Sequence, residues 1–245
     1  MLVTACDLRI YFGHQSVGAN IVTGIGELVA ARSAPPLRVV HLPAELPTDG
    51  GFFAHEPIGR NGDPAGKTDA FVDRLTGRIG DGLDVALHKY CYVDIGADTD
   101  VTRLFEHYRR RMSRLRETRP DVVLVHVTAP LRRVPSGPVT RLRAWVGPPP
   151  SQAAANAQRE RFNDLLREAC AGREPLFVLA AAEATMPDGR TWRPRLGRLA
   201  VRSLAPRYTD DGGHLNPRGR AHVAGRLLGF LADLSRRSES SRRAC

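Results

Sequence analysis

The stretch RIYFGHQSVG, residues 9–18, joins a predicted strand to a predicted helix. Apolar residues alternate up to Phe12, as in a strand, and Gly13 marks its end. From Val17 onward, apolar residues recur at helical spacing until a proline pair. Ser16 stands at the corner, where the unpaired N–H groups of a helix start favour negative charge. Two interpretations stay open at this point: Ser16 is a nucleophile, or it is an ordinary helix N-cap.

The rest of the chain repeats this alternation of strand and helix. The predicted strands are 8–12, 37–42, 83–93, 121–128 and 175–182, and the predicted helices are 17–34, 71–79, 102–118, 153–171 and 217–234. Such alternation is typical of an α/β fold, here a three-layer α/β/α sandwich with a mostly parallel five-stranded sheet. Two long loops, 43–67 and 131–151, lack a clear period. Because ligands of such sheets bind beyond the carboxyl ends of the strands, we expect these loops to shape the site.

Length and composition favour a single domain. The chain has 245 residues, of which 42% are hydrophobic, enough for one core over residues 1–236. Residues 237–245 form a polar segment that we expect to be a disordered tail. The sequence contains no long apolar run and no signal-peptide pattern, which favours a cytoplasmic protein without a membrane partner. Its four scattered cysteines indicate neither disulfides nor a zinc site.

The net charge of +10 raises the possibility of nucleic-acid binding. The arginines are spread over several predicted helices, however, and we interpret even the dense run at 109–119 as a solvated helix face. Nucleic acid is therefore not the favoured partner. The oligomeric state is not predicted.

Asp211 and His214 lie three residues apart in a glycine-rich turn before the last predicted helix. A serine hydroxyl becomes a good nucleophile when an imidazole takes its proton, and a carboxylate fixes the tautomer of that imidazole. Ser16, His214 and Asp211 supply these three groups, with Asp210 as the alternative carboxylate. The expected chemistry is attack on an ester or acyl group.

The motifs GHQSVG (13–18) and DGGHLNPRG (211–219), with an α/β alternation between them, resemble those of the SGNH (GDSL-type) hydrolase superfamily. The resemblance implies a flavodoxin-like α/β/α fold and an esterase, lipase, deacetylase or acyltransferase activity on a small-molecule or glycan acyl ester, without a cofactor. It implies Ser16 as nucleophile, His214 as general base and acid, and Asp211 as the orienting acid. His14 and Gln15 stand where the family has Gly-Asp.

The resemblance also implies an oxyanion hole built from the serine N–H, a glycine after the second strand and an asparagine after the third. Gly59 is the candidate glycine, with Gly62 behind it. The third strand is followed by HKYCYVD, which has no asparagine there. Asn61 and Lys89 are the candidate substitutes.

Several other side chains near the predicted strand ends need an interpretation. We expect the Lys89 ammonium to reach the strand end or to pair with an acid such as Asp94, and His14 and Gln15 to reshape the oxyanion side. Tyr90 and Tyr92 are interpreted as packing residues.

Two alternatives compete with the hydrolase hypothesis. The first is a metal site, because the histidines near the predicted strand ends could coordinate a metal ion together. They are His14, His41, His88, His126 and His214. None of them shows the HxH or HExxH spacing of a metal site, so we expect no metal. The second alternative is a catalytically impaired protein on the same fold that binds a ligand or a polyanion, which the missing asparagine and the positive charge both favour.

Overall fold

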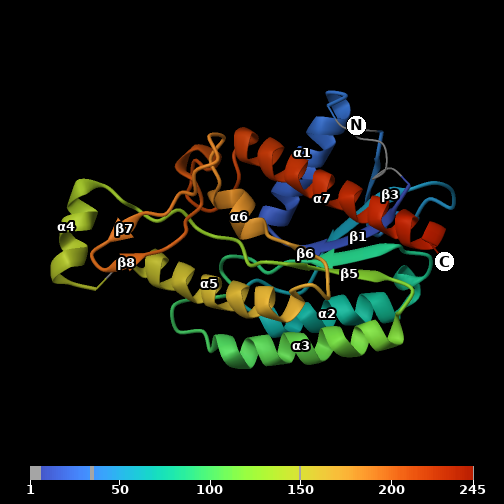
Figure 1. Cartoon of the computed structure of the whole chain (residues 1–245), viewed down its shortest axis with the longest axis horizontal. Helices are drawn as coiled ribbons and strands as arrows, with labels where there is room; N and C mark the ends of the chain where they lie inside the picture. The colour runs from blue at the N-terminus through green and yellow to red at the C-terminus, as the bar shows by residue number, and fades with distance from the viewer. Residues whose placement is uncertain (1–6, 34–35, 149, 245) are drawn as a thin grey trace.

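The computed structural model describes residues 7–33, 36–148 and 150–244. The main sheet has six parallel strands in the order β2-β3-β1-β4-β5-β6 (Figure 1). These strands are β1 (Arg9–His14), β2 (Arg38–His41), β3 (Phe52–Pro57), β4 (Val85–His88), β5 (Val123–Val127) and β6 (Leu176–Phe177). The helices are α1 (Val17–Ala30), α2 (Pro64–Thr76), α3 (Val101–Thr118), α4 (Pro138–Val146), α5 (Ser151–Cys170), α6 (Leu179–Ala184) and α7 (Pro217–Ala244).

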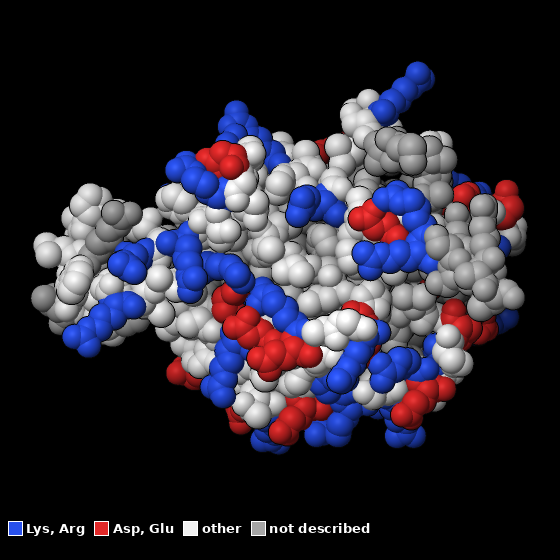
Figure 2. Space-filling model, in the orientation of Figure 1, with Lys and Arg blue, Asp and Glu red and all other residues white. Residues whose placement is uncertain are grey.

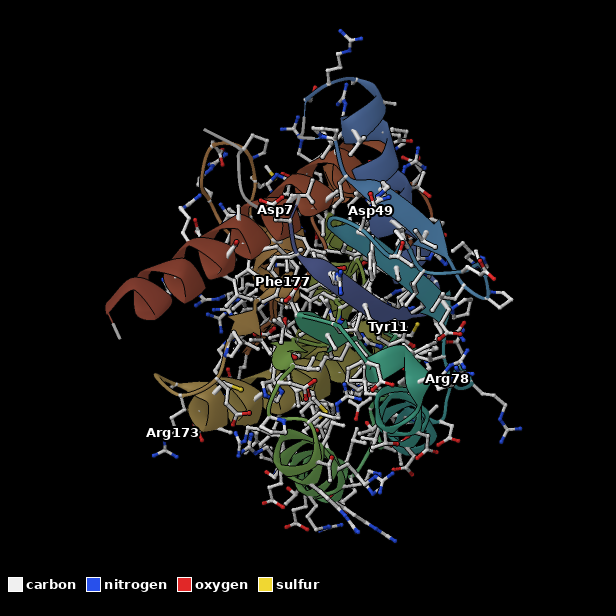
Figure 3. The ribbon with its side chains drawn as sticks, turned by 90° about the vertical axis from the view of Figure 1, so that its right-hand side faces the viewer. Asp7, Tyr11, Asp49, Arg78, Arg173 and Phe177 are labelled. Atoms are coloured by element: carbon white, nitrogen blue, oxygen red, sulfur yellow. The ribbon has the colours of Figure 1, made fainter. Side chains whose placement is uncertain are left out.

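The helices form a layer on each face of the sheet. α1, α6 and α7 pack on one face, where Ile21, Leu179 and Leu227 belong to one buried cluster with strand residues. α2, α3 and α5 pack on the other face, where Phe71 and Phe162 belong to a second cluster. Figure 3 looks onto the edge where the strands begin, with α1 and α7 above the sheet and α2, α3 and α5 below it. The predicted three-layer α/β/α sandwich is confirmed.

The sheet has one strand more than the sequence predicted, because β3 lies inside the expected loop 43–67. Phe52, Phe53 and Ala54 of this strand are all buried. The strand pairs on one side with β1 and on the other with β2. A short apolar run buried on both faces carries no alternation, so the period that marks a half-exposed strand is missing.

Two other segments also differ from the prediction. The segment 175–182 contains only a two-residue strand, β6, and continues as helix α6. The loop 131–151 contains helix α4, which begins at Pro138 and ends at Val146, with Gly147 directly after it. Proline at the first helical position is favourable, and glycine is a common residue just past a helix end.

The last helix begins where the sequence predicted. Asn216 caps it, with its Oδ1 atom accepting a hydrogen bond from the Gly219 N–H at 3.0 Å, and Pro217 is its first residue. The helix continues through residues 237–244, for which the sequence had predicted a disordered tail. No helix among the described residues is long and apolar enough to cross a membrane.

A lobe projects beyond the carboxyl ends of the strands, at the left of Figure 1. It consists of α4 and the small antiparallel hairpin of β7 (Arg195–Leu196) and β8 (Leu199–Ala200). A separate apolar cluster of Val134, Ala153, Leu196 and Val201 holds it together.

Candidate active site

Ser16 sits on a tight turn between β1 and α1. Its φ of +45° lies in the left-handed region, which costs a non-glycine residue about 1–3 kcal/mol. Two residues further on, a Cβ atom at Gly18 would lie 2.3 Å from the His14 Cβ, so this turn requires glycine. The Ser16 hydroxyl makes no capping hydrogen bond with α1, so the N-cap interpretation does not account for this side chain.

The Ser16 hydroxyl instead contacts a histidine from the other end of the chain. Ser16 Oγ lies 2.7 Å from His214 Nε2, and His214 Nδ1 lies 2.6 Å from Asp211 Oδ2. The second Asp211 oxygen accepts the backbone N–H groups of Gly213 and His214, both at 2.8 Å. The hydrogen bonds from His214 and from these N–H groups hold the pKa of Asp211 well below its usual range.

This geometry fixes the state of the imidazole. A carboxylate can only accept, so Asp211 holds the proton on Nδ1 and leaves the Nε2 lone pair directed at Ser16. Ser16, His214 and Asp211 therefore form a continuous hydrogen-bonded chain, the arrangement that a nucleophile, a base and an orienting acid require. Asp210, the alternative carboxylate, accepts instead from Asn216 Nδ2 at 3.0 Å.

Tyr92 packs against the buried cluster between the sheet and α1 and α7, as the sequence predicted, and its hydroxyl also approaches the same histidine. Its hydroxyl lies 3.5 Å from His214 Nε2, and the two rings meet edge to face at 5.8 Å. The Arg132 guanidinium lies 5.0 Å from the centre of the tyrosine ring, and Arg159 Nε donates to the Tyr92 carbonyl at 2.9 Å. The signal available in the sequence was its place at the end of the third predicted strand, near where the resembled family has its asparagine. Tyr90 is buried and packs as predicted.

The glycine loop after β3 lies on the other side of Ser16. Gly59 has a φ of +58°, and a Cβ there would lie 2.6 Å from Lys67 Cγ, so glycine is required. Gln15 Nε2 donates to the carbonyls of Ile58 and Gly59 at 3.1 and 3.0 Å. Gln15 thus fastens the loop to the serine turn.

His14 points into the protein and away from the triad. It is buried, and its Nε2 lies 3.0 Å from His55 Nδ1. Burial lowers the pKa of His14 to about 3, with the neighbouring His55 adding to the effect, so the ring is neutral at pH 7. Its side chain packs against Gly18 in the first turn of α1.

Asp94 joins the two loops that flank the triad. Its Oδ2 accepts from Lys67 Nζ at 2.6 Å and from the Cys91 N–H at 2.5 Å, and its Oδ1 accepts from the Gly62 N–H at 2.8 Å. Both charged side chains of the pair are fully buried. Lys67 Nζ also donates to Asn61 Oδ1 at 2.9 Å, which ties Asn61 to this network.

Lys89 is also buried but does not pair with Asp94, contrary to one of the two expectations. Its Nζ donates to the Tyr90 carbonyl at 3.2 Å and lies 3.6 Å from Cys91 Sγ, so it reaches the strand end, the other expectation. Burial lowers the pKa of Lys89. Asp94 pairs with Lys67 instead, because helix α2 places the Lys67 side chain next to it.

The strand-end histidines lie in separate environments. His126 contacts the Tyr108 hydroxyl at 2.7 Å and Glu174 at 2.7 Å, while His88 lies among aromatic rings. His214 contacts Ser16 and Asp211, and His14 and His41 both lie beside His55. Within the described part of the chain, no group of three His, Cys, Asp or Glu side chains is placed to hold a metal ion.

Comparison with solved structures identifies which proteins share this fold. No protein-family model and no curated protein sequence matches the chain. A GDSL-like lipase from Bacteroides thetaiotaomicron matches 93% of this chain and 89% of its own at 10% identity, with a TM-score of 0.55. A carbohydrate esterase family 3 protein from Talaromyces cellulolyticus matches 94% and 98% at 13% identity, with a TM-score of 0.52. The periplasmic domain of a lipopolysaccharide acetyltransferase from Salmonella ser. Paratyphi A matches 93% and 85% at 12% identity, with a TM-score of 0.51. The chain therefore has the fold of the GDSL-type (SGNH) esterases and lipases.

Proposed function

We propose that this chain is a serine hydrolase or acyltransferase that acts on an ester or acyl group through a covalent acyl-enzyme. The observation that carries the proposal is the continuous hydrogen-bonded chain from Ser16 Oγ through His214 to Asp211. A fold shared with a GDSL-like lipase, a carbohydrate esterase and an acetyltransferase domain supports it. The same fold serves hydrolysis and acyl transfer, so the acceptor is water or an alcohol.

The proposed reaction has two halves. Ser16 Oγ attacks the acyl carbon while His214 Nε2 takes the hydroxyl proton, and Asp211 stabilises the resulting imidazolium. The tetrahedral intermediate then collapses: the bond to the leaving oxygen breaks, and His214 returns the proton to that oxygen. In the second half His214 removes a proton from water or an acceptor hydroxyl, which attacks the acyl-enzyme and releases Ser16.

The oxyanion of the intermediate needs donors. The backbone N–H groups of Ser16 and Gly59 donate to no other described residue and are available for it. In this proposal the Tyr92 hydroxyl supplies the third donor in place of the missing asparagine, because it and Ser16 Oγ approach the same nitrogen of His214. Asn61 and Lys89 do not fill that role, since Asn61 is tied to Lys67 and Lys89 is buried behind the strand end.

Tyr92→Phe is expected to lower kcat for an activated acetyl ester about 100- to 1000-fold with a small change in KM, since one oxyanion donor is typically worth that much. Steady-state kinetics on 4-nitrophenyl acetate measures both constants. Tyr90→Phe is the matched control, because Tyr90 bonds Thr68 in the core and does not reach His214. An unchanged kcat in Tyr92→Phe would show that the Tyr92 hydroxyl is not an oxyanion donor.

A fluorophosphonate probe is expected to label the wild-type protein at Ser16, because the activated oxygen attacks phosphorus as it attacks an acyl carbon. Labelling should disappear in Ser16→Ala and His214→Ala and persist in Arg110→Ala, an exposed change on α3. In-gel fluorescence and mass mapping of the labelled peptide measure it. A wild-type chain that takes no label yet binds heparin with a steep salt dependence would be a binding protein on this fold, the alternative that the missing asparagine favours.

A further inference from the structure

The projecting lobe has an apolar face that no described part of the chain covers. On α4 the side chains of Val139, Leu142 and Trp145 are 63%, 69% and 70% exposed. Their spacing of three residues places them along one side of the helix. The remaining large exposed hydrophobic residue of the described chain, Val93, lies elsewhere, so the lobe holds almost all of this kind of surface.

The opposite side of α4 packs against the hairpin. Ala144 belongs to the cluster inside the lobe, and a Cβ at Gly197 of the hairpin would lie 2.5 Å from the Ala144 carbonyl. This close approach fixes the helix on its support. The apolar side of α4 therefore faces outward because the other side is already buried.

The lobe is also strongly basic. Residues 131–148 and 189–205, which form α4, the hairpin and the segments that lead to them, contain nine arginines and no acidic residue, in a chain whose net charge is +10. Arg190 pairs with Asp188 and Arg202 with Glu160. Arg143, Arg195 and Arg198 are exposed and have no acidic partner within the described chain. Figure 2 shows the lobe at the left end of the molecule, with blue arginines beside white surface.

We propose that the lobe is a docking surface for an anionic phospholipid bilayer. Arginines attract the negative headgroups, and a stripe of valine, leucine and tryptophan enters the boundary between headgroups and acyl chains. This mode needs no membrane-spanning helix. It differs from the expectation of no membrane partner, which rested on the lack of a long apolar run and of a signal-peptide pattern.

The apolar stripe distinguishes a bilayer from the other possible partners. A nucleic acid would use the arginines but would gain little from exposed valine and leucine side chains. A second copy of this chain would bring two acid-free arginine surfaces together, which like-charge repulsion opposes. An anionic bilayer satisfies the positive charge and the apolar stripe together.

The two tryptophans make the proposal directly measurable. Trp145 and Trp192 are the only ones in the chain, and both line a groove of about 560 Å³ in the lobe. Trp192 also packs against the main buried cluster, so Trp145 is the one that reports on the exposed surface. In Trp192→Phe, which keeps only Trp145, emission is expected to shift to the blue on adding vesicles of phosphatidylglycerol and phosphatidylcholine, and brominated acyl chains are expected to quench it. Pure phosphatidylcholine vesicles should give little change.

Sedimentation with the same vesicles measures the partition of each variant. Arg195→Glu/Arg198→Glu is expected to lower binding at least about 25-fold, at roughly fivefold for each arginine near the surface. Leu142→Ser should lower binding about tenfold or more through lost apolar burial. Arg110→Glu/Arg114→Glu on α3 is the matched control, with the same change of charge away from the lobe, and should bind nearly as the wild type does.

Three results would overturn the proposal. The first is absence of binding to anionic vesicles, and the second is equal loss in the α3 control. The third is a partner other than lipid: binding to DNA or RNA that the lobe arginines control and Leu142→Ser leaves unchanged, or self-association that Leu142→Ser abolishes. None of these measurements depends on catalysis, so the lipid proposal and the hydrolase proposal stand or fall separately.

Discussion

Ser16→Ala is expected to lower kcat for an activated ester on the order of 10⁶-fold, as is His214→Ala, and the double variant should be no worse than either single one. The reason is that the proposed nucleophile and base would act as one unit: without the imidazole the hydroxyl is not activated, and without the hydroxyl the imidazole has no proton to take. The 2.7 Å contact between Ser16 Oγ and His214 Nε2 makes this coupling direct. Pre-steady-state and steady-state rates on 4-nitrophenyl acetate measure it.

The neighbouring aspartates provide a matched pair for the same assay. Asp211→Asn should lower kcat about 10⁴-fold, because an amide can turn the imidazole to the wrong tautomer. Asp210→Asn should have little effect, because that carboxylate contacts Asn216 and not the histidine. Losses that add up across Ser16→Ala and His214→Ala, or equal losses for the two aspartates, would contradict the triad.

The parts of the site that were predictable from sequence depend on local geometry. Asp211 and His214 are three residues apart, and glycines at 212 and 213 let the turn close so that the carboxylate meets both the ring and the backbone. Ser16 follows a strand that ends in glycine, which places it at the corner without knowledge of the rest of the chain. The pairing of these two ends came from the chemistry of the three side chains and from the family resemblance of the two motifs.

The parts that were missed depend on contacts between distant segments. Tyr92 faces His214 because Arg159, 67 residues away in sequence, holds its carbonyl and Arg132 covers its ring. Alternation with Tyr90 suggested packing for both tyrosines, but the strand ends at His88, so no strand period governs them. β3 was missed for a related reason, since burial on both faces removes the alternating pattern.

Asp94→Asn is expected to lower the free energy of unfolding by about 3–5 kcal/mol, the second large effect. The substitution removes the negative charge that compensates the buried Lys67 ammonium, and removing one charge of a buried pair costs far more than the pair contributes as a whole. Urea denaturation followed by circular dichroism measures the change. Asp69→Asn is the control, because that carboxylate bonds Arg111 at the surface and should cost under about 1 kcal/mol.

The same pair links stability to the proposed chemistry. Asp94 accepts hydrogen bonds from the Gly62 N–H and from the Cys91 N–H next to Tyr92. The two loops that carry the proposed oxyanion donors Gly59 and Tyr92 therefore both depend on it. Lys67→Met/Asp94→Leu, which removes both charges, should recover much of the stability lost in Asp94→Asn, because no unpaired charge remains buried. It should not recover kcat, because apolar side chains cannot hold the N–H groups of Gly62 and Cys91. Recovery of stability and kcat together would mean that the flanking loops keep their places without Asp94.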